Sequence, residues 1–379
     1  MHRIPIPDRV RPRIHFARDL GFCLLPGVLA VLIIALGRID AGITDAVYSR
    51  RVFPIVTRII GLPGRFIPFS IVAVLIWSIA PLVLIALFWL IRRLRRSGDR
   101  RRTLWRALVI VLFVLSLIFF LFAITCAPNF NRLTLAQLTG LPVRSSTPQE
   151  LVDLCVELTV RANEAREAAA EDDSGVFTVT EPFSALSQRS LQAFNALVPE
   201  YPFLTPCVTA PKAMIGSEAL SHMEVTGFYS CFTAEPNVNV HMPALELPFT
   251  MCHELAHTGG ILREDEANFI GYLACTRSDD PALRYSGLVC ALNYAAGKLY
   301  GISPDTYREL RSYYHEGIER DLAASGAYWA QYEDKKPAQV YSAVNDTVLK
   351  LNSQTDGRQS YGRMVDLLLA EYRVNHSLE

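Results

Sequence analysis

Apolar residues are concentrated in the first third of this chain, and that asymmetry constrains the fold more than any other feature. Three stretches without a charged side chain occupy residues 21–37, 66–91 and 107–125. A helix needs about 20 apolar residues to cross the roughly 30 Å of hydrocarbon in a bilayer. We therefore expect residues 1–127 to form a membrane domain of three transmembrane helices. Residues 128–379 are expected to form a globular domain outside the bilayer.

Arginine residues predict the orientation of these helices. Arginines recur before the first apolar stretch, and a dense cluster occupies residues 92–102, between the second and third stretches. Positively charged loops stay in the cytoplasm, so we expect a cytoplasmic N-terminus and an extracytoplasmic domain after the third helix. A cleaved signal peptide is the alternative interpretation of the first stretch, but no clean cleavage site of small residues follows it.

Charge and polarity exclude two other classes of protein. Basic and acidic residues number 37 each, so the formal net charge is +0. A neutral chain lacks the basic face that general nucleic-acid binding needs, and we expect no nucleic-acid partner. None of the three apolar stretches contains an ionisable residue, which argues against an ion pathway and therefore against a transporter. The stretches are better explained as anchors in a lipid bilayer.

The region after the apolar stretches has the pattern of a mainly helical domain with a small sheet. A threonine, a proline and a glutamate within residues 147–150 form a typical helix start. The segment most typical of strands is residues 227–233, followed by residues 237–241. Cys207 and Cys231 flank a segment that contains proline and glycine, so a disulfide between them is one option in an oxidising compartment.

A short motif within this domain has the spacing of a metal site. His253, Glu254 and His257 form the pattern HExxH in a helical context. Residues four positions apart lie on one face of a helix, so the two imidazoles can bind a single Zn²⁺ ion. Zinc lowers the pKa of a bound water to about 7, and the carboxylate of Glu254 can then accept its proton as a general base.

A third ligand is expected from the helix that follows. Glu264 and Asn268 are again four positions apart. This spacing allows Glu264 to bind the metal while Asn268 makes a hydrogen bond to a histidine ring. Three protein ligands would leave one coordination position open for water, as in catalytic zinc sites.

The chain resembles a bacterial membrane-protein family that combines N-terminal transmembrane helices with an HExxH domain of unknown function. The resemblance covers nearly the whole chain and rests on HELAHTGGILREDEANFIGYLA, GFYSCFTAEPNVN and LNSQTDGRQSYGRMVDLLLA. More distantly, HExxH followed by E-x-x-A-(D/N) is similar to gluzincin metallopeptidases such as the CAAX prenyl proteases. The resemblance implies a zincin-like α+β domain in a bacterial cell membrane, with His253, His257 and Glu264 as ligands and Glu254 as general base.

Two features depart from the gluzincin pattern. Asn268 stands where that pattern has an aspartate, and only six residues separate His257 from Glu264. The short spacing keeps Glu266 as an alternative third ligand. The asparagine favours a second hypothesis, in which a zincin-like sensor module binds a metal or a peptide without turnover.

Two further candidates would complete an active site. In zincins an edge strand lies beside the metal and pairs with an extended peptide. Phe228, Tyr229, Ser230 and Cys231 are the candidates for that strand, and an ordinary core strand is the alternative. Tyr361 is a candidate for stabilising an oxyanion, with a purely structural tyrosine as the alternative. Together these patterns predict a membrane-anchored zinc metallopeptidase that acts on a peptide or protein substrate.

Overall fold

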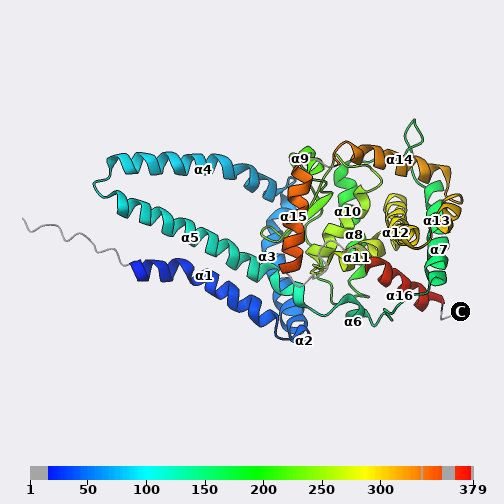
Figure 1. The fold of residues 1–379 in the computed structure, drawn as a ribbon, viewed down its shortest axis with the longest axis horizontal. Coiled ribbons are helices and arrows are strands. Elements are labelled where there is room, and N and C mark those ends of the chain that lie inside the picture. Colours follow the sequence, from blue (N-terminus) through cyan, green and yellow to red (C-terminus); the bar gives the residue numbers. More distant parts are fainter. Residues whose placement is uncertain (1–15, 334–335, 352–362, 377–379) are drawn as a thin grey trace, which may run out of the picture.

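The structure is a computed structural model that describes residues 16–333, 336–351 and 363–376. It is mainly helical, with one small sheet, as the sequence predicts. Three long apolar helices extend from one end of a helical body that is built from the later part of the chain (Figure 1).

The three extended helices are α1 (Phe16–Gly37), α4 (Ile71–Arg96) and α5 (Arg100–Thr125). Each contains a segment long and apolar enough to cross a membrane. Little of their surface is buried within the protein, so their apolar side chains face outward, as lipid-exposed helices require. The existence of three such helices is therefore confirmed.

The ends of these helices differ from the predicted ends by several residues, because capping residues set the helix starts. α4 begins after Ser70, whose side chain accepts a hydrogen bond from the backbone N–H of Ala73. α5 begins after Asp99, whose side chain accepts one from Arg102. Hydropathy marks only the part of a helix suited to hydrocarbon, so the arginine-rich turns at these ends were left out of the predicted spans.

Residues 41–66 form helical structure that hydropathy did not predict. The elements are α2 (Ala41–Ile43), the π-helix η1 (Thr44–Val52) and α3 (Phe53–Phe66). α3 packs on the helical body, where the hydroxyl of Thr209 donates a hydrogen bond of 2.8 Å to the carbonyl of Gly61. Its apolar residues are interrupted by arginines, so it lacks the continuous apolar run of a membrane span.

A three-stranded sheet lies beside the helical body. It consists of β1 (Lys212–Ala213), β2 (Gly227–Ser230) and β3 (Glu235–Val238), in the order β1-β3-β2. β3 pairs in parallel with β1 and antiparallel with β2, with Gly227 opposite Val238. β2 is therefore an edge strand among the residues that the structure describes. The predicted edge strand included Cys231, but the strand ends at Ser230.

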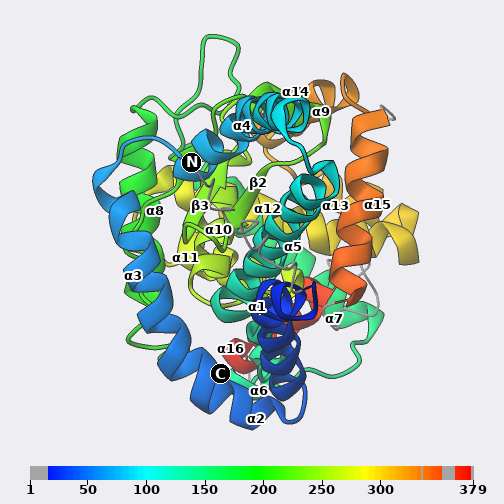
Figure 2. The same cartoon turned by 90° about the vertical axis from the view of Figure 1, so that its left-hand side faces the viewer.

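The helical body surrounds one large apolar core. α10 and α11 lie at its centre, packed against each other and against α8 and α12 (Figures 1 and 2). α7 begins with the predicted capping box at Thr147. The elements are η2 (Ala127–Asn131), α6 (Leu135–Thr139), α7 (Pro148–Glu167), α8 (Phe183–Leu197), α9 (Ser217–His222), α10 (Leu247–Thr258), α11 (Glu264–Thr276), α12 (Pro281–Ile302), α13 (Pro304–Arg311), α14 (Glu316–Ala330), α15 (Lys336–Leu351) and α16 (Met364–His376).

A buried arginine connects the segment before the second span to the core of the body. Arg132 is 1% exposed, and its guanidinium donates hydrogen bonds of 2.9 and 2.7 Å to one carboxylate oxygen of Asp45 in η1. The same guanidinium donates to the carbonyls of Gly260 and Phe203, each at 3.1 Å. A buried acceptor that lacks a hydrogen bond destabilises the folded state. By donating to all three of these acceptors, the arginine stabilises the junction.

We expect Arg132→Ala to lower the free energy of unfolding by about 3–5 kcal/mol, because it leaves one oxygen of the buried Asp45 carboxylate and two buried carbonyls without this donor, although Arg50 still pairs with the other oxygen of Asp45. The measurement is denaturant unfolding of the full chain in detergent. Arg308→Ala is the control, since Arg308 pairs with Asp305 at the surface and its loss should cost at most about 1 kcal/mol. Equal effects of the two substitutions would contradict a structural role for the buried pair.

Candidate metal centre

Two consecutive helices and a tight turn bring the chemically important side chains together. α10 carries His253 and His257 one turn apart, with ring centroids separated by 4.6 Å. The chain then reverses at Gly260, whose φ of +96° lies in the region that favours glycine. After this turn α11 begins at Glu264, so that its first residue faces the two rings.

The three side chains have the separations of ligands around one metal ion. A carboxylate oxygen of Glu264 lies 3.4 Å from Nε2 of His253 and 3.7 Å from Nε2 of His257. Ligands placed about 2.1 Å from a tetrahedral zinc ion are roughly 3.4 Å apart. All three donor atoms lie within 4.8 Å of one another, and the donor set of two imidazoles and one carboxylate suits zinc. The residues present therefore fit a zinc ion.

A backbone hydrogen bond orients one of the two rings. Nδ1 of His257 lies 2.7 Å from the carbonyl oxygen of Ile261 and donates to it, which leaves the lone pair of Nε2 directed at Glu264. Nδ1 of His253 is buried, and in the described part of the chain it has no hydrogen-bond partner. The two imidazoles are thus held by different means.

Asn268 lies against the same cluster. Its side-chain amide donates a hydrogen bond of 3.3 Å to the hydroxyl of Tyr294. Burial and the neighbouring His257 lower the pKa of His253, whereas Glu264 and the nearby side chain of Asn268 oppose that shift. Asn268 therefore lies beside His253, a position that its helical spacing allows.

Glu266 is directed away from the histidines. One of its carboxylate oxygens accepts hydrogen bonds from the backbone N–H of Leu135 at 2.7 Å and from the guanidinium of Arg263 at 3.1 Å. These bonds fasten the start of α11 to the start of α6. Of the two candidate third ligands, the structure brings Glu264, and not Glu266, to the two rings.

Glu254 is a buried carboxylate next to the metal cluster. It is 3% exposed, and its Oε2 atom has no hydrogen-bond partner among the residues that the structure describes. Burial raises the pKa of Glu254 to about 8; His257 opposes this shift and Glu264 adds to it. A carboxylic acid with such a pKa can exchange a proton near neutral pH.

A glycine in the edge strand makes room for this carboxylate. A Cβ atom at Gly227 would lie 2.7 Å from Oε1 of Glu254 and 2.9 Å from the carbonyl oxygen of Asn237. Any larger residue would displace Glu254 or separate β2 from β3. Motif spacing does not identify Gly227 as part of the site, but a glycine in a strand is itself a signal of close approach by another group.

The charges of the cluster favour a cation between the two rings. Burial raises the pKa of Glu264. His257 and His253 lower this pKa by more than burial raises it, so it lies well below the usual range. Burial lowers the pKa of His257, Glu264 raises it, and the net value is about 9. The carboxylate of Glu264 therefore attracts positive charge to this space, either a proton on an imidazole or a metal ion.

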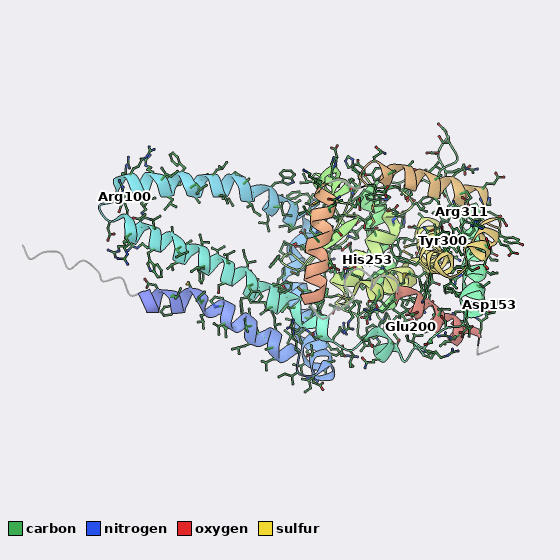
Figure 3. The ribbon with its side chains drawn as sticks, in the orientation of Figure 1. Arg100, Asp153, Glu200, His253, Tyr300 and Arg311 are labelled. Atoms are coloured by element: carbon green, nitrogen blue, oxygen red, sulfur yellow. The ribbon has the colours of Figure 1, made fainter. Side chains whose placement is uncertain are left out.

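The cluster opens into a cavity of about 660 Å³. Figure 3 shows His253 inside the helical body, close to the end where the long helices enter it. The cavity is lined by residues of α10, α11 and α12, the edge strand β2, the end of α5 and the helix α15. Its wall includes three of the four predicted substrate-strand residues, namely Phe228, Tyr229 and Cys231. The fourth, Ser230, is buried and pairs with Thr233.

The remaining sequence predictions for the site have different outcomes. Tyr361 lies outside the described residues. The disulfide between Cys207 and Cys231 is not formed, because both thiols are free. Cys207 is buried against α10 instead, where its thiol interacts with the carbonyl of Leu255 at 3.5 Å.

Comparison with known protein families gives a match over most of the chain. The sequence pattern of a family described as "Protein of unknown function (DUF3810)" matches residues 48–369. Neither the curated proteins nor the solved structures contain a match to this chain.

Proposed function

We propose that this chain, which belongs to the DUF3810 family, is a membrane-anchored zinc metallopeptidase with a zincin-like domain outside the cytoplasm. One observation carries the proposal. The donor atoms of His253, His257 and Glu264 have the separations of a tetrahedral zinc site, and the buried carboxylate of Glu254 adjoins them. Two imidazoles, a carboxylate ligand and a separate general base are the components that zinc-dependent peptide hydrolysis requires.

Each residue has a defined task in this proposal. His253, His257 and Glu264 would hold Zn²⁺, which when bound would supply Lewis-acid activation of a water molecule and of the scissile carbonyl. The carbonyl of Ile261 keeps the ring of His257 in the tautomer that presents Nε2. Glu254 accepts a proton from the attacking water on its carboxylate and then donates it to the leaving amine.

The edge strand β2 is the proposed position of the substrate. An extended peptide can add to the edge of a sheet through its backbone hydrogen bonds. β2 borders both the cavity and Glu254, so a peptide paired with it would pass the metal cluster. The apolar wall formed by Phe228, Phe249 and Val289 would accommodate side chains of that peptide.

The arrangement of arginines supports an extracytoplasmic location for the site. Arg100 lies at the tip of the hairpin between α4 and α5, at the end farthest from the helical body (Figure 3). α1 begins near the same end (Figure 1), and the sequence that precedes it contains several arginines. Positively charged segments tend to remain in the cytoplasm, so the proposal has the opposite end, with the helical body, on the other side of the membrane.

A sensor module without turnover is the second candidate function. Two observations favour it over an enzyme: Asn268 replaces the aspartate of gluzincins, and Nδ1 of His253 has no partner in the described part of the chain. Weaker support of the metal ligands is the physical consequence of both. Stable zinc binding without hydrolysis of any peptide would favour this function.

The test of the proposed function is metal analysis combined with a peptidase assay on the full chain purified in detergent. We expect about one zinc ion per chain and hydrolysis of peptides from a mixed library. A chelator should remove both zinc and activity, and added zinc should restore both. A protein that holds no zinc after purification and binds none when zinc is added would refute the proposal.

A further inference from the structure

Two cysteines from distant parts of the chain meet at the wall of the metal cavity. Cys126 is the residue directly after α5, and Cys231 is the residue directly after β2. Both line the cavity that contains the metal cluster. Neither residue has a task in the proposed hydrolysis, so their proximity needs a separate explanation.

Neighbouring side chains place the two thiols against each other. The side chains of Cys126 and Cys231 interact with each other, and the side chain of Thr125 interacts with both. The hydroxyl of Tyr48 in η1 donates a hydrogen bond of 3.0 Å to the carbonyl of Ile124. This bond attaches the end of α5, just before Cys126, to η1. The side chains of Cys126 and Cys231 therefore lie next to each other at the cavity wall.

We propose that Cys126 and Cys231 are a redox-active pair, and that their disulfide ties the end of α5 to the turn after β2. This bond would attach the last turn of a membrane-spanning helix to the strand that borders the metal cluster. The proposal concerns a covalent modification and does not depend on peptidase activity.

The two thiols differ in the way that stepwise oxidation requires. The hydrogen bond from Cys126 lowers the pKa of Cys231, whereas burial raises the pKa of Cys126 well above its usual value. Cys231 is also the more accessible of the two. A thiolate is the nucleophile in disulfide exchange, so Cys231 is the residue that an external disulfide would meet first.

The reaction balances with a small disulfide such as glutathione disulfide as the oxidant. The thiolate of Cys231 attacks one sulfur of the oxidant and expels a glutathione thiolate, forming a mixed disulfide. Cys126 then loses its proton and attacks the Cys231 sulfur, expelling the second glutathione. Two protein thiols are oxidised to one disulfide, and the external disulfide is reduced to two thiols.

The other cysteines serve as internal comparisons. Cys252 and Cys275 also contact each other, but both are fully buried in the core between α10 and α11. An oxidant cannot reach them without unfolding of the body. Cys207 is buried too, and its thiol interacts with the carbonyl of Leu255.

The experiment is peptide mapping of the full chain in detergent after incubation with glutathione disulfide, with free thiols alkylated before digestion. We expect a cross-linked peptide joining Cys126 to Cys231, and a higher Tm than that of the reduced protein. Cys126→Ser should leave Cys231 joined to glutathione, whereas Cys231→Ser should leave Cys126 unmodified. Cys207→Ser is the control and should retain the cross-link.

Two outcomes would overturn the proposal. One is a cross-link of Cys231 to Cys207, or of Cys252 to Cys275, in place of the expected link. The other is a wild-type protein in which both Cys126 and Cys231 remain free at an excess of glutathione disulfide. Both outcomes are read from the wild-type chain, so neither depends on the folding of a variant.

Discussion

Glu254→Gln should reduce peptide hydrolysis by about 10²–10⁴-fold, the usual contribution of a general base, while the protein keeps its zinc. Glutamine has nearly the same shape as glutamate but cannot accept a proton from water at neutral pH. Glu254 is not one of the three clustered metal donors, so its loss leaves the ligands in place. The measurement compares kcat/KM and zinc content of the variant and the wild-type chain.

The stability of this variant provides a second measurement. The structure buries Glu254, and burial disfavours its charged form. A neutral glutamine avoids that cost, so the Tm should be unchanged or higher. Glu266→Gln is the matched control, because Glu266 is an equally buried carboxylate that bonds to Leu135 and Arg263 outside the metal cluster. Full activity in Glu254→Gln would rule out its role as the base.

Glu264→Gln should lower the affinity for zinc by more than the roughly 10–100-fold that loss of an outer hydrogen-bond partner costs. Its carboxylate oxygen lies within 3.7 Å of both histidine Nε2 atoms, and an amide is a much poorer zinc ligand. His253→Ala should lose zinc as well. Zinc content by elemental analysis, and competition with a chelator of known affinity, measure the effect.

The comparison with Glu266 decides between the two carboxylates that the sequence left open. Glu266→Gln retains an acceptor oxygen for Leu135 and Arg263 and should keep its zinc. Loss of zinc in Glu266→Gln together with its retention in Glu264→Gln would show that the third ligand has been assigned to the wrong residue.

The membrane part of the fold could be predicted well, because hydropathy needs no knowledge of distant contacts. The three apolar stretches form three long helices, although two of these helices begin at the capping residues Ser70 and Asp99 and not where the apolar stretches begin. The helix α3 could not be predicted in this way. Its position depends on contacts with the helical body, such as that between Gly61 and Thr209, and these are formed only by packing.

Only part of the candidate metal centre could be predicted, because local spacing determines some of its contacts and tertiary packing determines the others. His253 and His257 belong to one helix, where the spacing of four residues alone puts them on one face. Glu264 was one of two options, since the choice depends on how the turn at Gly260 directs α11. Gly227 lies in β2, far from Glu254 in the sequence, so the spacing of residues within a helix could not predict their close approach.

Patterns that act within a helix or along a continuous apolar run determined the membrane anchors, the mainly helical body and the HExxH pair from sequence alone. The tertiary structure decided which distant groups meet: Glu264 and not Glu266 at the histidines, Arg132 at Asp45, and Cys126 and not Cys207 at Cys231. The physical reason is range. Helical periodicity and hydropathy are properties of neighbouring residues, whereas hydrogen bonds and thiol contacts between remote segments exist only after the core has packed around them.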